Sequence, residues 1–307
     1  MTREEINEEK QKEIFNEDRK AKIKKIIKWS IKAILIITIL IGGFFTYNSY
    51  VATVKIKVRE YRVVNSKIPE SFNGIKIIQF SDLHYGSTMN EENLKDIKKL
   101  INDRKPDLIV FTGDLIDSNY KISEKQKELL SKRLKELNAT LGKYAILGDE
   151  DSEEIITIYN QSDFTILKNE YELIYNEKND PIILIGLDSL IEGRRSIDQA
   201  YSYFKQETYN SNIYTITIMH EPDSAIDLLG TYQTDLALAG HSHNGNIRIP
   251  IANIPLEKKE GAKKYNQDYY QIGSTDLYVS SGLGTNNKTG IRFFCRPSIN
   301  FYRLSNK

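Results

Sequence analysis

The 307-residue sequence is short of cysteine and has no excess of either charge. Cys295 is the only cysteine, which excludes an intramolecular disulfide and a zinc site built from cysteines. The chain has 43 Lys and Arg residues against 42 Asp and Glu residues, so its net charge of +1 gives no reason to expect a nucleic-acid-binding surface. Apolar residues make up 40% of the chain, which is enough to form a real core.

Charge is missing altogether from one long segment near the amino terminus. Residues 33–52 read AILIITILIGGFFTYNSYVA, and a helix of this length spans about 30 Å, the thickness of a bilayer's hydrocarbon core. Trp29, Tyr47 and Tyr50 lie at its ends, where interfacial aromatic residues are enriched. We therefore predict a membrane-spanning helix over 33–52. A cleaved signal peptide and a buried core helix are the alternatives.

Positive charge is more concentrated before this segment than after it. Seven Lys and Arg residues lie in residues 19–32 and four in residues 55–62. Such an excess favours the cytoplasmic side of the membrane. The predicted organisation has three parts: a charged cytoplasmic tail at 1–32, a single-pass membrane helix at 33–52, and one domain outside the cytoplasm at 53–307.

Short apolar runs alternate with helical patterns in the rest of the chain. Residues 91–104 carry apolar side chains at helical spacing, and Ser123 with Gln126 has the pattern of a helix-capping box. This alternation is typical of parallel strands with helical crossovers, so we predict an α/β domain. The predicted strands are 75–80, 107–111, 144–147, 182–187, 214–219, 236–239, 276–279 and 301–304.

Polar side chains gather directly after these predicted strands. The chain has only four histidines, and all four lie at such positions, together with several aspartates. Binding sites of open α/β sheets form at the carboxyl ends of strands. The residues at these positions are Asp82, His84, Asp114, the three acids Asp149, Glu150 and Asp151, then His220, His241 and His243.

These residue types suit a metal centre. Imidazole and carboxylate groups are ligands for Mn, Fe, Zn and similar ions. Four histidines and three aspartates are more than one ion needs, and they suit two ions that share a carboxylate. Such a pair can activate a bridging hydroxide and clamp a phosphoryl group. A single histidine after a strand is more often structural, and an isolated acidic turn is usually solvated, but five such segments in a fixed order favour the metal site.

The order of the segments, D-x-H, G-D, G-D-E-D, H and G-H-x-H, resembles the calcineurin-like metallophosphoesterase superfamily. AGHSHNGNIRIP (239–250) and SSGLGTNN with IRFFCRPSI (280–299) further resemble its membrane-anchored bacterial branch, which includes phosphodiesterases and lipid-precursor hydrolases. The resemblance implies a two-sheet sandwich flanked by helices. It implies that one metal ion takes Asp82, His84, Asp114 and His243. It implies that the second ion takes Asp114 as a bridge, with Asp149, His220 and His241.

The third segment departs from the family pattern G-N-H-[DE]. Asp149 replaces the family's Asn and keeps an oxygen ligand. Glu150 replaces a His that contacts the phosphoryl group or protonates the leaving oxygen, and an anionic Glu can do neither. Asp151 matches the acid that orients this His. We predict Glu150 as the catalytic candidate, acting either as a general acid or as an impediment to phosphate.

Two functions of different classes follow from this departure. In the first, the chain is a membrane-anchored hydrolase of a phosphodiester or phosphomonoester, with two divalent metal ions as cofactors. In the second, it is a metal-loaded sensor or binding domain with impaired catalysis. We favour the hydrolase because all seven ligand positions keep suitable donors. The position next to a bilayer favours lipid head groups, cell-envelope phosphodiesters or exported nucleotides as substrates.

Overall fold

The computed structural model divides into two compact units, residues 1–49 and 50–307. It describes residues 3–48, 52–53, 55–177, 180–228, 231–249, 254–256, 258–285 and 290–307.

The first unit is a single helix, α1 (Arg3–Tyr47). Its segment Ile6–Tyr47 is long and apolar enough to cross a membrane, and the most apolar part of it is not buried. The predicted membrane helix at 33–52 overlaps the end of α1. Residues 49–51 of that predicted segment lie outside the described residues.

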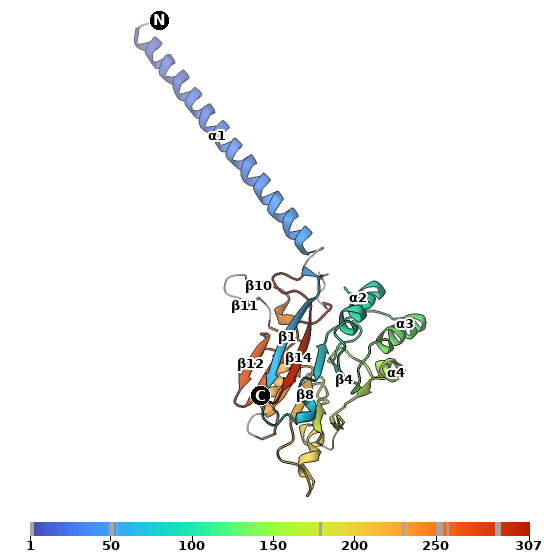
Figure 1. Ribbon diagram of the computed structural model, residues 1–307. Coiled ribbons are helices and arrows are strands. Elements are labelled where there is room, and N and C mark those ends of the chain that lie inside the picture. Colours follow the sequence, from blue (N-terminus) through green and yellow to red (C-terminus); the bar gives the residue numbers. More distant parts are fainter. Residues whose placement is uncertain are drawn as a thin grey trace. The chain divides into compact units, whose positions relative to one another are not determined.

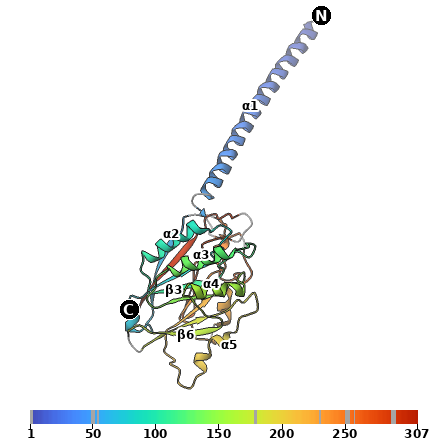
Figure 2. The same cartoon turned by 90° about the vertical axis from the view of Figure 1, so that its right-hand side faces the viewer.

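The second unit contains two six-stranded sheets (Figures 1 and 2). The first sheet, in spatial order, consists of β1 (Lys57–Val64), β14 (Ser298–Ser305), β2 (Lys76–Phe80), β3 (Leu108–Thr112), β4 (Lys143–Ile146) and β5 (Thr165–Ile166). The second consists of β12 (Tyr269–Ile272), β13 (Thr275–Val279), β9 (Leu236–Ala239), β8 (Thr215–Met219), β7 (Ile182–Gly186) and β6 (Glu170–Ile174). A separate hairpin pairs β10 (Arg248–Ile249) with β11 (Ile254–Pro255).

The central strands run parallel, as the alternating pattern predicted. β2, β3, β4 and β5 are parallel to one another, and so are β7, β8 and β9. Helix α2 (Glu91–Asn102) connects β2 to β3, and α3 (Glu124–Lys135) connects β3 to β4. The predicted capping box of Ser123 and Gln126 begins α3. Helix α2 ends two residues before the end of the predicted segment 91–104.

Three apolar layers hold the unit together. Residues from both sheets, such as Val110 and Ile216, form one cluster between them. Helices α2, α3 and α4 (Ile156–Gln161) cover the outer face of the first sheet, as both views show (Figures 1 and 2). The short helices α5 (Ile197–Ala200) and α6 (Ala225–Leu228) contribute to a cluster on the second sheet. The predicted α/β two-sheet sandwich flanked by helices is therefore confirmed.

The strands that the sequence did not predict lie mostly at sheet edges. β1 mixes charged and apolar residues and is half-exposed, with only Val63 fully buried. β6 has the same half-exposed character. An edge strand needs only one apolar face, so it lacks the continuous apolar run that marks a buried parallel strand.

Candidate metal centre

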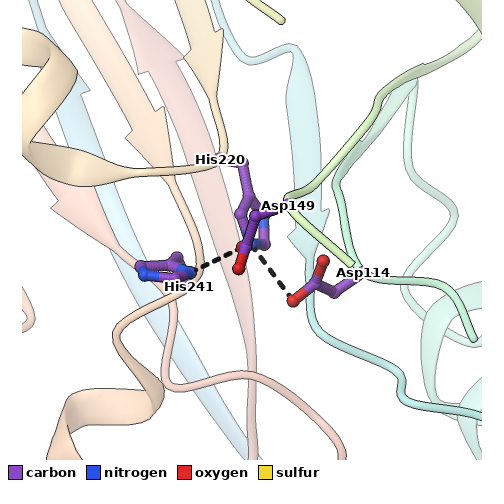
Figure 3. A group of neighbouring side chains, drawn as sticks. All are labelled: Asp114, Asp149, His220 and His241. Atoms are coloured by element: carbon purple, nitrogen blue, oxygen red, sulfur yellow. Dashed lines mark ion pairs between the residues drawn. The ribbon is translucent and has the colours of Figure 1, made fainter. Parts of the chain in front are cut away.

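The seven predicted ligands meet at the carboxyl ends of β2, β3, β4, β8 and β9. The structure brings them together as two groups, and within each group the ligand atoms lie within 4.8 Å of one another. One group contains Asp114, Asp149, His220 and His241 (Figure 3). The other contains Asp82, His84 and His243.

In the first group, two carboxylates and two imidazoles point at one another. Asp149 Oδ1 lies 3.0 Å from His220 Nε2 and 2.9 Å from His241 Nδ1 (Figure 3). Asp114 Oδ2 lies 3.2 Å from His220 Nε2. All four atoms are buried, and among the described residues none of them has a hydrogen-bond partner. Buried polar atoms normally have such partners, so this arrangement is typical of a cation site.

Backbone carbonyls fix which nitrogen of each imidazole faces the carboxylates. His220 Nδ1 lies 2.6 Å from the Thr112 carbonyl oxygen, and His241 Nε2 lies 2.7 Å from that of Glu260. A carbonyl only accepts, so each of these nitrogens carries the proton and donates. The opposite nitrogen of each neutral ring then presents a lone pair to the centre, as in metal-ligating histidines.

Asp114 lies between the two groups. Its Oδ2 is 3.6 Å from His84 Nε2, in addition to its contact with His220. In the second group, His84 Nε2 lies 3.1 Å from His243 Nε2, which is 3.4 Å from Asp82 Oδ1. The position of Asp114 is therefore the one that a shared carboxylate requires.

The carboxylates and imidazoles of the first group shift one another's pKa values. Burial raises the pKa of Asp149, but the close approach of the His220 and His241 imidazoles outweighs this effect and holds its pKa well below the usual range. Burial lowers the pKa of His220, but the neighbouring Asp114 and Asp149 raise it well above the usual value, so they favour either a proton on Nε2 or a cation bound to its lone pair. The carboxylates thus stay ionised in a buried place, and positive charge is favoured beside them.

Left-handed backbone conformations gather at these ligands. The φ angles of Asp82, His84, Asp114, His241 and His243 are 50°, 43°, 60°, 62° and 43°. Residues with a side chain adopt such angles only when the surrounding structure holds them there, and they cluster at functional sites. The sequence pattern of single ligands after strands gave no indication of this strain.

Two glycines allow the loops after β3 and β4 to approach each other. Gly113 has a φ of 90°, and a Cβ there would lie 2.5 Å from His220 Nδ1. A Cβ at Gly148 would collide with the Asp114 carboxylate. Any larger residue at either position would displace a predicted ligand.

Asp151 joins the same two loops from beneath. Its buried carboxylate accepts hydrogen bonds from the backbone N–H groups of Asp114 (2.8 Å), Leu115 (2.9 Å) and Gly148 (2.8 Å). Burial and the negative charge of Asp114 raise the pKa of Asp151, and the N–H donors lower it. The raising effects are larger, and the pKa is about 7. Sequence reasoning matched Asp151 to an acid that orients its neighbour at position 150, and missed this role in holding the loops.

Glu150 is directed toward the loop after β3. Its Oε2 accepts hydrogen bonds from the Ser118 N–H (3.1 Å) and hydroxyl (3.0 Å). The same oxygen lies 3.6 Å from His84 Nδ1, which is an ion-pair distance and too long for a hydrogen bond. Glu150 also lines a cavity of about 180 Å³ with Ser118, Tyr120 and several isoleucines.

Arg292 is a site residue that sequence reasoning missed. Its side chain is fully buried, and it donates to the carbonyl oxygens of Ser281 (2.7 Å) and Gly282 (3.3 Å). One guanidinium nitrogen also lies 3.2 Å from His243 Nδ1. An arginine inside the apolar run IRFFC was the only signal available.

Comparison with known proteins identifies the family. The sequence profile of the calcineurin-like phosphoesterases matches residues 75–245. The chain belongs to this family. The resemblance seen in the order of the ligand segments is thereby confirmed, and the family is one of hydrolases that generally bind divalent metal ions.

Three relatives of this calcineurin-like phosphoesterase are similar to it in sequence over most of its length. The uncharacterized metallophosphoesterase YkuE of Bacillus subtilis is 34% identical, with 86% of this chain and 90% of that protein covered. The UDP-2,3-diacylglucosamine pyrophosphatase LpxG of Chlamydia muridarum is 27% identical, with 76% and 85% covered. A transmembrane protein with metallophosphoesterase domain from Danio rerio is 25% identical, with 74% and 53% covered.

Proposed function

We propose that the protein is a membrane-anchored phosphoesterase that hydrolyses a phosphodiester or phosphomonoester with two divalent metal ions. The observation that carries this proposal is the convergence of four buried ligand atoms on Asp114, Asp149, His220 and His241, none with a hydrogen-bond partner among the described residues. A site with no use for a cation has no physical reason to bury these atoms together.

Seven residues would hold the two ions. Asp82, His84 and His243 would hold the first, and Asp149, His220 and His241 the second, with Asp114 shared. Divalent ions bound there supply a Lewis acid for the phosphoryl oxygens and an activated water at neutral pH.

The chain's own groups prepare this site in advance. The carbonyl oxygens of Thr112 and Glu260 hold the imidazoles of His220 and His241 in the required tautomers. The Asp151 carboxylate holds the loops that carry Asp114 and Asp149. Ligands fixed in this way need no rearrangement when substrate binds, which is the main requirement of electrostatic catalysis.

Glu150 does not act as a general acid in this proposal. Its Oε2 accepts two hydrogen bonds from Ser118, an arrangement that suits an ionised carboxylate, and such a group has no proton to give. No protein acid then assists the leaving group. The site therefore favours substrates whose leaving group is stable as an anion, such as the phosphate released from a pyrophosphate linkage. The similarity to a relative named as a pyrophosphatase supports this substrate class.

This proposal can be tested on the purified full-length chain in detergent. We expect Mn²⁺-dependent hydrolysis of a nucleotide pyrophosphate diester and of bis-p-nitrophenyl phosphate, with much slower hydrolysis of dialkyl phosphates. A chelator should abolish the activity and Mn²⁺ should restore it. If the protein binds metal but leaves every phosphoester intact, the sensor interpretation replaces the hydrolase.

We also propose that the amino terminus is cytoplasmic and that the phosphoesterase unit lies outside the cytoplasm. The excess of Lys and Arg before residue 33 supports this orientation, and the transmembrane relative supports membrane attachment. Alkaline phosphatase fused after Lys307 should be active in bacterial cells, because this enzyme matures only outside the cytoplasm, and green fluorescent protein at the same position should be dark. An inactive alkaline phosphatase fusion together with a fluorescent green fluorescent protein fusion would contradict this orientation.

A further inference from the structure

Four large apolar side chains are exposed together around the β10–β11 hairpin. Ile249 is 43% exposed, Ile254 51%, Leu256 65% and Phe294 54%. Ile249 pairs with Ile254 across the hairpin. The neighbouring Arg248 N–H donates to the Phe293 carbonyl (3.0 Å), which joins the hairpin to the segment that carries Phe294. We call these four side chains the hairpin surface.

The hairpin surface lies next to the point where the chain enters the second unit. The segment that carries Phe294 continues to Arg296 and Pro297. Arg296 Nε donates to the Lys55 carbonyl (3.0 Å), and the Lys57 N–H donates to the Pro297 carbonyl (2.7 Å). Figure 1 shows β10 and β11 near the beginning of β1.

Covalent connection limits how far this surface can be from a membrane that α1 crosses. α1 ends at Tyr47, and Lys55 follows eight residues later. A chain of eight residues reaches at most about 28 Å, at about 3.5 Å per residue. The end of α1 is therefore at most about 28 Å from Lys55, so a bilayer that α1 crosses is within reach of the segment that carries the hairpin surface.

The hairpin surface is also connected to the metal centre. The chain passes from Leu256 to Glu260, whose carbonyl oxygen holds the His241 imidazole at 2.7 Å. On the other side of the hairpin, Arg248 donates to the Asn244 carbonyl (3.0 Å), next to His243. The segments on both sides of the hairpin therefore contact the G-H-x-H segment, which carries His241 and His243.

Basic residues flank the hairpin surface along the chain. Lys258, Lys263 and Lys264 are exposed after β11, and Lys55 and Lys57 are exposed at the start of the unit. The acids of the same stretches are Glu257, Glu260 and Glu60, so basic residues are in excess. Apolar side chains with flanking lysines are the combination by which interfacial segments bind anionic bilayers.

We propose that the hairpin surface inserts into the interfacial region of an anionic bilayer. Exposed apolar clusters with a polar rim mark interaction sites, and the bilayer is the occupant that the short connection to α1 keeps within reach. Because β1 is parallel to β14 and β14 is antiparallel to β2, the carboxyl end of β2, which carries metal ligands, lies at the end of the sheet where β1 begins. A surface docked there brings the metal centre close to lipid head groups, so a phosphoester in a head group is a candidate substrate. The proposal rests on the membrane anchor proposed above and is independent of catalytic activity.

A fluorescent label at position 256 tests this proposal in the full-length chain. Leu256→Cys is labelled with the environment-sensitive fluorophore NBD and reconstituted into vesicles of phosphatidylcholine and phosphatidylglycerol. Cys295 is only 2% exposed and the unsubstituted chain measures its background labelling. Tyr175→Cys is the matched control, because Tyr175 is 54% exposed and follows β6, at the far edge of the second sheet from β12.

Doxyl-labelled lipids should quench NBD at position 256 about twofold or more and leave the label at position 175 unchanged. Equal quenching at both positions, or none at 256, overturns the proposal. Protection of the 256 label from aqueous iodide without quenching by lipid also overturns it, because a second copy or another protein then covers the surface. If quenching at position 256 is the same in vesicles without phosphatidylglycerol, the flanking lysines do not contribute by binding anionic lipid, and that part of the proposal is wrong.

Discussion

Replacing Asp114 with alanine should empty both metal sites. Its Oδ2 lies 3.2 Å from His220 Nε2 and 3.6 Å from His84 Nε2, so this carboxylate oxygen reaches both ligand groups. We expect metal content to fall from about two ions per chain to nearly none, and hydrolysis to fall to background, because the ions supply the activated water. Elemental analysis of the purified protein measures the first effect directly.

Two control variants separate this effect from general damage. His84→Ala removes a ligand of one group only, so it should lose about half of the metal. Asp235→Ala removes a buried carboxylate that belongs to none of the possible ligand groups among the described residues, and it should keep both ions. Full metal content in the Asp114 variant, with its fold intact by circular dichroism, would show that the shared-carboxylate assignment is wrong.

Replacing Glu150 with histidine should raise activity on substrates with poor leaving groups. Histidine restores the family's residue at this position and can protonate a leaving oxygen, and positioned proton transfer typically contributes about 10²–10⁴-fold. It also removes a negative charge that lies 3.6 Å from His84 Nδ1. We expect kcat on dialkyl phosphodiesters to rise about 10²-fold, with little change on p-nitrophenyl esters, whose leaving group needs no proton.

Glu150→Gln is the matched control, because it removes the charge without supplying an acid. It should change the rates on both substrate types by a similar, smaller factor and leave metal content unchanged. If activity on both substrate types falls sharply in the His and Gln variants, Glu150 is a general acid or a substrate ligand. The proposal that it impedes phosphate would then be wrong.

The ligand positions were accessible from the sequence because they follow from strand order. A buried parallel strand is rich in apolar and β-branched residues, and the strands before Asp82, Asp114 and His220 are short, buried segments of this kind. Parallel strands end at the same edge of a sheet, so polar residues directly after them must lie close together. The sequence therefore predicted the seven residues that the structure brings together, and their metal-binding role stays a prediction.

Tertiary structure alone decided how those residues are held. Thr112 and His220 are 108 positions apart in the chain, and no local pattern pairs a backbone carbonyl with a ring nitrogen at such a separation. The same applies to Asp151, whose carboxylate accepts from Asp114 and Leu115 across two loops. The direction of Glu150 toward Ser118 likewise depends on how the loops after β3 and β4 pack. Residue type and spacing determined which groups meet, and long-range packing decided which atom of each group faces the centre.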